Sequence, residues 1–229
     1  MAVLREAVAE RHASRRLSAS PEQTLITNGV QQAIDLTVRA LAEPLDPVLI
    51  ESPTYPGAPD ALTGNHSRVI AVGINDSVTA LGTSIRQVLP RLAYLITDFQ
   101  NPTGRLLDSA SRAFVVEAAE SSRSRLVVDG TFVELGPDNS DLPPPLASCE
   151  RGDTVISVGS VSNAFWGIAH WLSACGPHHR GISCRGPGNT GHGESDPRPA
   201  SQMPSTLNTM RTHLCSSSRR FPVPWLAGP

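Results

Sequence analysis

Apolar residues recur along much of the chain at a spacing that predicts amphipathic helices. In residues 28–43, Val30, Ile34 and Val38 repeat every four positions, which places them on one face of a helix. Similar spacing predicts helices within residues 4–13, 83–90 and 107–122. Asp108 is the expected N-cap of the last of these, because a short acceptor side chain satisfies a free N–H group at a helix start.

Between the helices lie short runs that are apolar nearly throughout. They occupy residues 25–27, 47–52, 68–73, 92–99, 124–132 and 154–162. Strands of this kind, alternating with helices, form a sheet that is buried on both faces. We therefore predict an α/β fold with a mostly parallel sheet and helices on both faces. In such folds ligands bind at the carboxyl ends of the strands, so the search for chemistry starts there.

The alternation stops near residue 168. Residues 168–229 are rich in Pro, Gly, Ser and Arg and show no sustained period. Such a composition buries too little apolar surface to offset the entropy lost on ordering. We therefore predict a folded domain over residues 1–167 and an irregular, disordered tail over residues 168–229. A shift of reading frame in a GC-rich gene would produce such a switch in composition.

The same tail holds four residues that can bind zinc. Cys175, His178, His179 and Cys184 lie close together in the sequence. Their spacing is not that of a standard zinc finger, in which paired ligands bracket a ribbon and a helix. A disordered tail is therefore the preferred interpretation, and a metal site is the alternative.

Composition and charge exclude some functions. The 229 residues carry a net charge of −2, and all 19 basic residues are arginine, so the chain contains no lysine. A guanidinium group stays protonated and cannot act as a nucleophilic amine. No apolar run approaches the roughly 20 residues of a membrane helix, and the first residues lack the apolar stretch of a secretion signal. We expect a cytoplasmic protein that does not contact a membrane.

Polar residues stand at the ends of several predicted strands. Asn28 and Gly29 open a helix, where free N–H groups favour an anion, although most such turns are only caps. Tyr55 stands between prolines, either in a rigid turn or as an aromatic plate for a planar ring. Asn101 and Asp129 are either turn residues or ligand-binding groups, Asn101 for an oxygen and Asp129 for a protonated ring nitrogen.

Four motifs in one order are more specific than any of them alone. The segments TNGVQQAIDL, ESPTYPG, NPTG and VGSVSNAFWG follow one another over residues 27–167. In this order they resemble fold-type I pyridoxal-phosphate enzymes of the aminotransferase class I/II group. Within that group the chain most resembles the aminotransferase-like domain of MocR-type GntR regulators. The resemblance covers roughly residues 3–167.

The resemblance implies a cofactor site for pyridoxal 5'-phosphate. The phosphate would be held by the backbone around Gly29, Val30 and Gln31, with help from Ser160 and Ser162. Tyr55 would stack on the pyridine ring, and Asn101 would donate to the ring hydroxyl oxygen. Asp129 would pair with the ring nitrogen and keep it protonated, which makes the ring an electron sink. Phe132 stands where many relatives have a tyrosine hydroxyl.

One position departs from the family pattern. Asn163 stands where the family has the lysine that forms the Schiff base with the cofactor. An amide nitrogen is not basic, and covalent capture of an aldehyde needs a free amine. The resemblance also implies an arginine soon after residue 167 that clamps the phosphate, and this sequence has none before Arg180. We therefore expect a truncated, catalytically inactive domain that binds the cofactor without a covalent bond.

The partners follow from the same resemblance. Family members transfer amino groups between amino acids and keto acids, and they usually form homodimers. MocR-type regulators fuse this domain to a winged-helix DNA-binding domain, for which this sequence has no counterpart. The leading interpretation is an aminotransferase-like domain without activity, and the alternative is a non-covalent sensor of pyridoxal phosphate or its amino-acid adduct.

Overall fold

The computed structural model describes residues 2–74, 78–133, 142–151, 153–160 and 171–175. One sheet runs through it, with the strand order β1-β7-β6-β5-β4-β2-β3. The strands are β1 (Thr24–Thr27), β2 (Pro47–Ser52), β3 (Arg68–Gly73), β4 (Leu92–Leu95), β5 (Arg125–Asp129), β6 (Val155–Ser160) and β7 (Trp171–Cys175). The helices are α1 (Ala2–Ser14), α2 (Val30–Leu41), α3 (Gly57–Gly64), α4 (Val78–Val88) and α5 (Ser109–Ser122). Two short 3-10 helices, η1 (Pro21–Gln23) and η3 (Leu146–Cys149), complete the described elements.

Most neighbouring strands pair in parallel. The parallel pairs are β2 with β3, β2 with β4, β4 with β5, and β5 with β6. β7 is antiparallel to both β1 and β6, so β1 runs in the same direction as β6. The predicted fold class, α/β with a mostly parallel sheet, is confirmed. Among the described strands, β7 alone runs opposite to the other six.

The strand at residues 171–175 corrects the sequence analysis. These residues were assigned to the irregular tail, but the structure places them in the sheet between β1 and β6. Composition averaged over a long segment conceals a short, mostly apolar segment, whereas two neighbouring strands can satisfy its backbone groups. Residues 176–229, which include three of the four proposed zinc ligands, lie outside the described residues, and the side chain of Cys175 is likewise not described.

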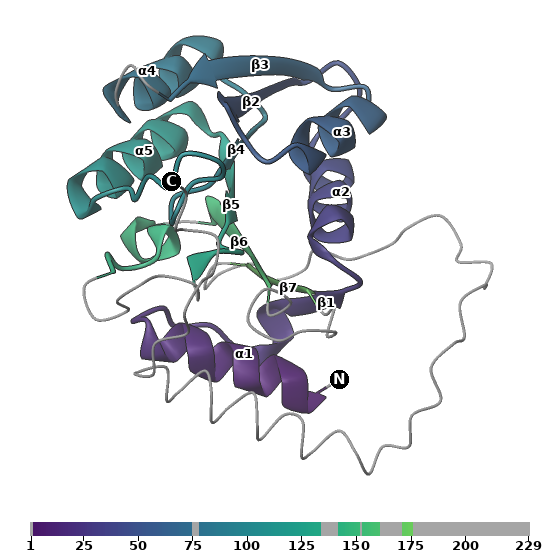
Figure 1. Cartoon of the computed structure of the whole chain (residues 1–229), viewed down its shortest axis with the longest axis vertical. Helices are drawn as coiled ribbons and strands as arrows, with labels where there is room; N and C mark the ends of the chain where they lie inside the picture. The colour runs from purple at the N-terminus through teal and green to yellow at the C-terminus, as the bar shows by residue number, and fades with distance from the viewer. Residues whose placement is uncertain (1, 75–77, 134–141, 152, 161–170, 176–229) are drawn as a thin grey trace, which may run out of the picture.

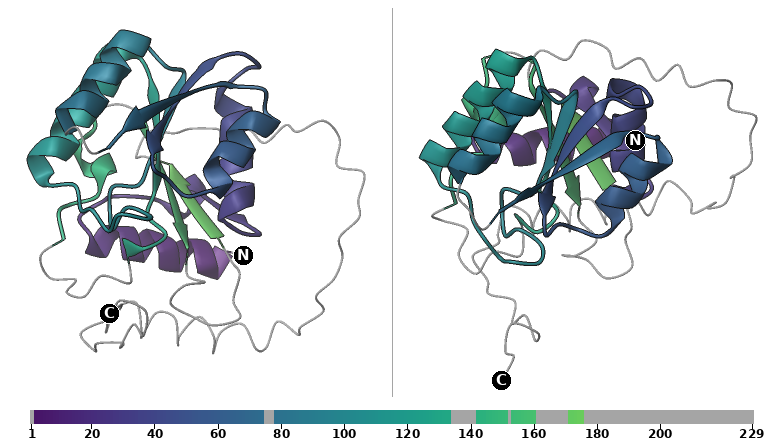
Figure 2. Two further views of the ribbon diagram at one scale, coloured as in Figure 1. Left: turned by 45° about the horizontal axis from the view of Figure 1, so that its top comes forward. Right: turned by 90° about the horizontal axis from the view of Figure 1, so that it is seen from above.

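Helices cover both faces of the sheet, as the sequence predicted. α4 and α5 lie on one face, α2 and α3 lie on the other, and α1 lies at the end that holds β1 and β7 (Figures 1 and 2). The sequence of β4 is apolar throughout because both of its faces are covered by helices. Leu92 and Tyr94 pack in the cluster that includes residues of α2 and α3, whereas Ala93 and Leu95 pack in the cluster with α4 and α5. Alternate side chains of a strand point to opposite faces, and both faces are buried here.

None of the described helices has the length and apolar character that a membrane crossing requires. The predicted helix start at Asp108 is confirmed, since its side chain accepts a 2.7 Å hydrogen bond from the Ser111 N–H group.

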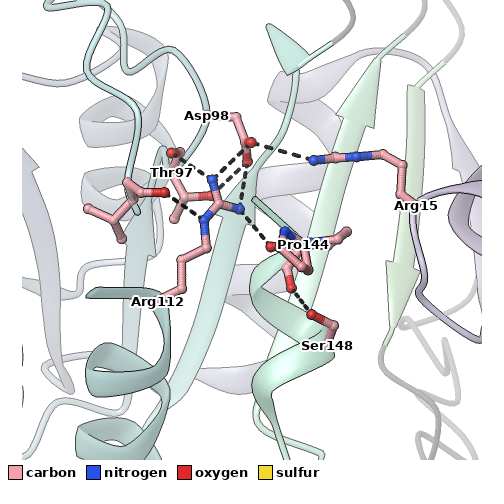
Figure 3. Close-up of polar contacts among 8 residues, drawn as sticks. Arg15, Thr97, Asp98, Arg112, Pro144 and Ser148 are labelled. Atoms are coloured by element: carbon pink, nitrogen blue, oxygen red, sulfur yellow. Dashed lines mark hydrogen bonds and ion pairs between the residues drawn. The ribbon is translucent and has the colours of Figure 1, made fainter. Parts of the chain in front are cut away.

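A buried ion pair connects the segments around the carboxyl end of β4. Arg112 of α5 is fully buried, and its Nη2 lies 3.0 Å from Oδ1 of Asp98 (Figure 3). Nη2 of Arg15, near the end of α1, lies 3.5 Å from the same oxygen. The Arg112 guanidinium also donates to the backbone carbonyls of Leu107, Thr97 and Pro144. One side chain therefore holds together α5, the segment after β4 and the segment before η3.

We expect Arg112→Met to reduce the free energy of unfolding by about 3–5 kcal/mol, because the substitution leaves a buried carboxylate and several carbonyls without this partner. The measurement is urea denaturation followed by circular dichroism. Arg39→Met is the matched control, since Arg39 forms an exposed ion pair with Asp35 on α2, and such pairs contribute about 0.3–0.5 kcal/mol. Equal losses in the two variants would contradict the role given to Arg112.

A second buried acidic group lies in β2. Glu51 is 6% exposed, and its Oε2 accepts a 2.8 Å hydrogen bond from the Ile96 N–H group. Burial raises the pKa of Glu51 to about 7, while the hydrogen bond from Ile96 and the charge of Arg105 act in the opposite direction. Below about pH 7 the Glu51 carboxyl group is therefore mostly protonated in the folded chain.

This raised pKa predicts a loss of stability as the pH rises. Because the pKa is about 7 in the folded chain against an ordinary 4.5, the contribution of Glu51 is fully present below 4.5 and is lost as the pH passes 7. Glu51→Gln should match the parent chain near pH 5 and exceed its unfolding free energy near pH 8 by up to about 3 kcal/mol. Urea denaturation at both pH values measures this. Glu117→Gln, at an exposed side chain, is the control, and a Glu51→Gln difference that does not change with pH would contradict the assignment.

Candidate functional site

The carboxyl ends of five strands meet at one edge of the sheet. β1, β6, β5, β4 and β2 all run in the same direction, so the residues that follow them are brought to the same edge. The predicted site residues stand at these ends: Gly29, Val30 and Gln31 after β1, Tyr55 after β2, Asn101 after β4, Asp129 at the end of β5 and Ser160 at the end of β6. The predicted Ser162 and Asn163 lie outside the described residues.

Asp129 is the buried acid of this edge. It is 4% exposed, and its Oδ1 accepts a 2.8 Å hydrogen bond from the Thr131 N–H group and a second bond from the Thr131 hydroxyl. Its Oδ2 accepts a 2.5 Å bond from the Tyr94 hydroxyl. Burial raises the pKa of Asp129, and the bonds from Thr131 and Tyr94 partly oppose that change. Asp129 bonds to the turn that follows it, but it is buried and not the solvated turn residue that was the alternative.

Tyr94 belongs to the site although the sequence analysis did not select it. Its side chain is 1% exposed, and burial together with the neighbouring Asp129 raises the pKa of its hydroxyl. Glu51 and Tyr55 also raise the pKa of that hydroxyl, so Tyr94 lies near the predicted stacking tyrosine as well as Asp129. In the sequence Tyr94 stands inside an apolar run. The feature that could have identified Tyr94 in the sequence is its hydroxyl, the single polar side-chain group in an otherwise apolar strand.

The turn before α2 suits a negatively charged group. Gly29 has a φ of 118°, a conformation in which a residue with a side chain is strained. It precedes the first turn of α2, where backbone N–H groups have no partner within the helix and the helix dipole favours an anion. The Thr27 hydroxyl donates to the Gly29 carbonyl over 3.3 Å. This hydrogen bond connects the turn to the end of β1, the strand that precedes it.

Tyr55 is held in place by contacts with α2 and α3. The Gln31 side-chain amide donates a 2.7 Å hydrogen bond to the Gly57 carbonyl. A Cβ added to Gly57 would lie 2.6 Å from Cε1 of Tyr55 and would also collide with the Gln31 side chain. Only glycine at position 57 therefore permits this packing, and Tyr55 remains half-buried with part of its side chain accessible.

Gln100 is a second residue that the sequence analysis did not select. Its side-chain nitrogen donates a 2.7 Å hydrogen bond to the Pro53 carbonyl, and its side-chain oxygen accepts bonds from the Thr103 backbone and hydroxyl. Gln100 thus joins the loop that carries Asn101 to the turn that carries Tyr55. The Asn101 side chain is half-buried and makes no hydrogen bond with the described residues, which leaves its amide available to a ligand.

The groups at this edge fit a planar nitrogen heterocycle that carries a phosphate. Asp129 offers a buried carboxylate to a protonated ring nitrogen, and Tyr55 offers an aromatic face. Asn101 offers an amide donor, and the first turn of α2 offers N–H groups to a phosphate. Phe132 is half-buried and brings no hydroxyl group to this set. The donor set thus agrees with the cofactor that the motifs implied.

Comparison with known proteins supports the same conclusion. Residues 1–173 match the family described as aminotransferase class I and II. The chain is 34% identical over 151 residues to a 2-aminoadipate transaminase of Thermus thermophilus, a match that covers 64% of this chain and 38% of that enzyme. It is 29% identical over 164 residues to the probable rhizopine catabolism regulatory protein MocR of Rhizobium meliloti, which covers 71% of this chain and 33% of that protein.

A solved structure has the same fold. LysN, an alpha-aminoadipate aminotransferase from Thermus thermophilus complexed with N-(5'-phosphopyridoxyl)-L-leucine, superimposes with a TM-score of 0.69 at 32% identity. That match covers 77% of this chain and 46% of LysN. The chain therefore spans between one third and one half of the length of these relatives.

The relatives include both a transaminase and a MocR regulator, so both classes that the motifs resembled are confirmed. The family match covers most of the described sheet and every described residue of the site. On this evidence the chain belongs to the aminotransferase class I and II family, whose cofactor is pyridoxal phosphate.

Proposed function

We propose that this chain binds pyridoxal phosphate non-covalently at the carboxyl edge of its sheet and acts as a binding module for the cofactor and an amino acid. The observation that carries the proposal is the buried carboxylate of Asp129, held by Thr131 and Tyr94. A carboxylate in so apolar a place is costly unless a cationic partner offsets the cost. The protonated ring nitrogen of the cofactor is such a partner.

The described residues divide the work of holding the cofactor. Asp129 holds the proton on the ring nitrogen, and Thr131 and Tyr94 fix the orientation of its carboxylate. Tyr55 covers one face of the ring and excludes water from it, and Asn101 donates to the ring oxygen. The N–H groups after Gly29 bind the phosphate, and Ser160 lies at the neighbouring strand end. Pyridoxal phosphate, when bound, supplies an electron sink for amino-acid chemistry.

The absence of lysine from the sequence supports binding without covalent capture. Asn163 stands at the position of the family's lysine, and none of the 229 residues is a lysine. An amide cannot attack an aldehyde or carry a proton between carbon atoms, because its nitrogen lone pair is delocalised. We therefore propose that the chain does not catalyse amino transfer.

The relatives suggest two candidate roles. The similarity to MocR favours amino-acid or cofactor sensing within a regulator, and this is the role we propose. The similarity to a 2-aminoadipate transaminase favours amino transfer as the second candidate, with an amino acid as substrate. The two differ in whether the cofactor becomes covalently attached to the protein, so attachment is the property to test.

We expect Asp129→Asn to weaken binding of pyridoxal phosphate about tenfold or more, because a charge-assisted hydrogen bond contributes about 1.5–3 kcal/mol. Isothermal titration of the purified chain measures the affinity. Asp35→Asn, which removes an exposed carboxylate on α2, is the control and should bind like the parent chain. Unchanged affinity in Asp129→Asn, with its fold confirmed by circular dichroism, would mean that the carboxylate does not contact the ring nitrogen.

We expect Asn163→Lys to attach pyridoxal phosphate covalently without restoring efficient amino transfer. The substitution supplies the missing amine, whereas turnover also needs groups that fix the substrate, and such positioning can lower a barrier by about 7–11 kcal/mol. Borohydride reduction followed by mass spectrometry detects attachment, and a coupled assay detects transfer. Gln87→Lys on the exposed side of α4 is the control for non-specific labelling. Rapid amino transfer by the parent chain would refute the proposed role.

A further inference from the structure

A basic cavity lies at the opposite edge of the sheet from the cofactor site. Four arginines line it: Arg91 before β4, Arg123 and Arg125 around the start of β5, and Arg151 before β6. We name these four residues the arginine basin. The cavity has a volume of about 630 Å³ and is also lined by Glu120 and Ser124. It stands at the amino ends of the strands, so a ligand there would not compete with pyridoxal phosphate.

The positive charge of the arginine basin contrasts with the net negative charge of residues 1–167. Residues 1–167 contain 13 arginines and 19 acidic residues, yet the basin gathers four of those arginines around a lining that contains one carboxylate, that of Glu120. An acidic domain thus has a local excess of positive charge. Such a concentration of like charge attracts anions and raises their local concentration.

Three of the four guanidinium groups are unpaired within the described part of the chain. The side chains of Arg123, Arg125 and Arg151 make no ion pair or hydrogen bond with described residues. Arg91 differs, because its Nε donates a 2.7 Å bond to the Leu41 carbonyl and lies 4.0 Å from Oδ2 of Asp46. Most of the donor capacity of the basin therefore remains for a ligand.

Backbone contacts fix the positions of two of these arginines, Arg125 and Arg123. Arg125 is the first residue of β5, and its N–H group donates 3.1 Å to the Arg91 carbonyl, so both residues are held in the parallel pairing of β4 and β5. Arg123 caps the carboxyl end of α5, where its charge also complements the helix dipole. Arg123 and Arg125 are thus positioned by α5 and β5 at the cavity wall.

One hydroxyl at the cavity wall is buried and has no partner among the described residues. Ser124 is 2% exposed, and its Oγ has no hydrogen-bond partner among the described residues. A buried polar group without a partner is unfavourable by about 1–3 kcal/mol.

We propose that the arginine basin binds a small molecule that carries a di- or triphosphate group. Guanidinium groups match phosphate oxygens with paired N–H donors, whereas a lone inorganic ion would leave most of them unused. The volume of about 630 Å³ lies within the roughly 300–1,000 Å³ of small-molecule sites and exceeds the need of a single phosphate. The basin is a second ligand site, independent of the cofactor site.

The test is isothermal titration of the full chain with pyrophosphate at physiological salt, where weak surface attraction is largely screened. We expect binding by the parent chain and at least a tenfold loss in Arg125→Gln and in Arg123→Gln. Arg86→Gln is the control, because Arg86 is an exposed arginine on α4 that pairs with Glu117, and it should bind within twofold of the parent chain. Affinity for pyridoxal phosphate should stay unchanged in all three variants.

Other outcomes would overturn the proposal. No heat of binding with pyrophosphate in the parent chain, or equal affinity in the basin variants and in Arg86→Gln, would show that the basin is an ordinary solvated surface. Binding of duplex DNA that pyrophosphate does not displace, and that the basin substitutions abolish, would assign the basin to nucleic acid instead of a small phosphate ligand.

Discussion

The buried ion pair between Arg112 and Asp98 is the contact on which the carboxyl edge depends. Asp98 begins the loop that leads to Asn101, and Arg112 joins that loop to α5 and to the Pro144 carbonyl (Figure 3). Gln100, in the same loop, donates a hydrogen bond to the Pro53 carbonyl and so connects the loop to the turn that carries Tyr55. The positions of two candidate site residues, Asn101 and Tyr55, therefore depend on one guanidinium group.

The carboxyl edge also concentrates acidic groups whose burial makes their ionisation unfavourable. Burial raises the pKa of Asp129 and brings that of Glu51 to about 7, so burial makes the charged form of both groups less favourable. Tyr94 is buried against the first of them. Buried acids with raised pKa values reduce stability at neutral pH and are common where a protein binds a charged ligand. The proposed binding of pyridoxal phosphate would give one of these acids, Asp129, a cationic partner.

Local pattern was sufficient for most of the fold and for locating several candidate site residues at one edge of the sheet. Helical spacing gave α2 and α5, apolar runs gave the parallel strands, and polar residues after strands gave Tyr55, Asn101 and Asp129. The missed features all depend on distant contacts. β7 forms because two strands accept it, and Tyr94 matters because Asp129 faces it. A single sequence does not display such pairings, since neither partner marks the other by spacing.

The protonation state of the bound cofactor is the most direct test of the account. Pyridoxal phosphate with an isotope-labelled ring nitrogen, bound to the parent chain, can be followed by nitrogen NMR at a pH above the pKa of the free ring. The account predicts a protonated ring nitrogen on the parent chain, because Asp129 holds the proton, and an unprotonated one on Asp129→Asn. A ring nitrogen that stays unprotonated on the parent chain would contradict the account.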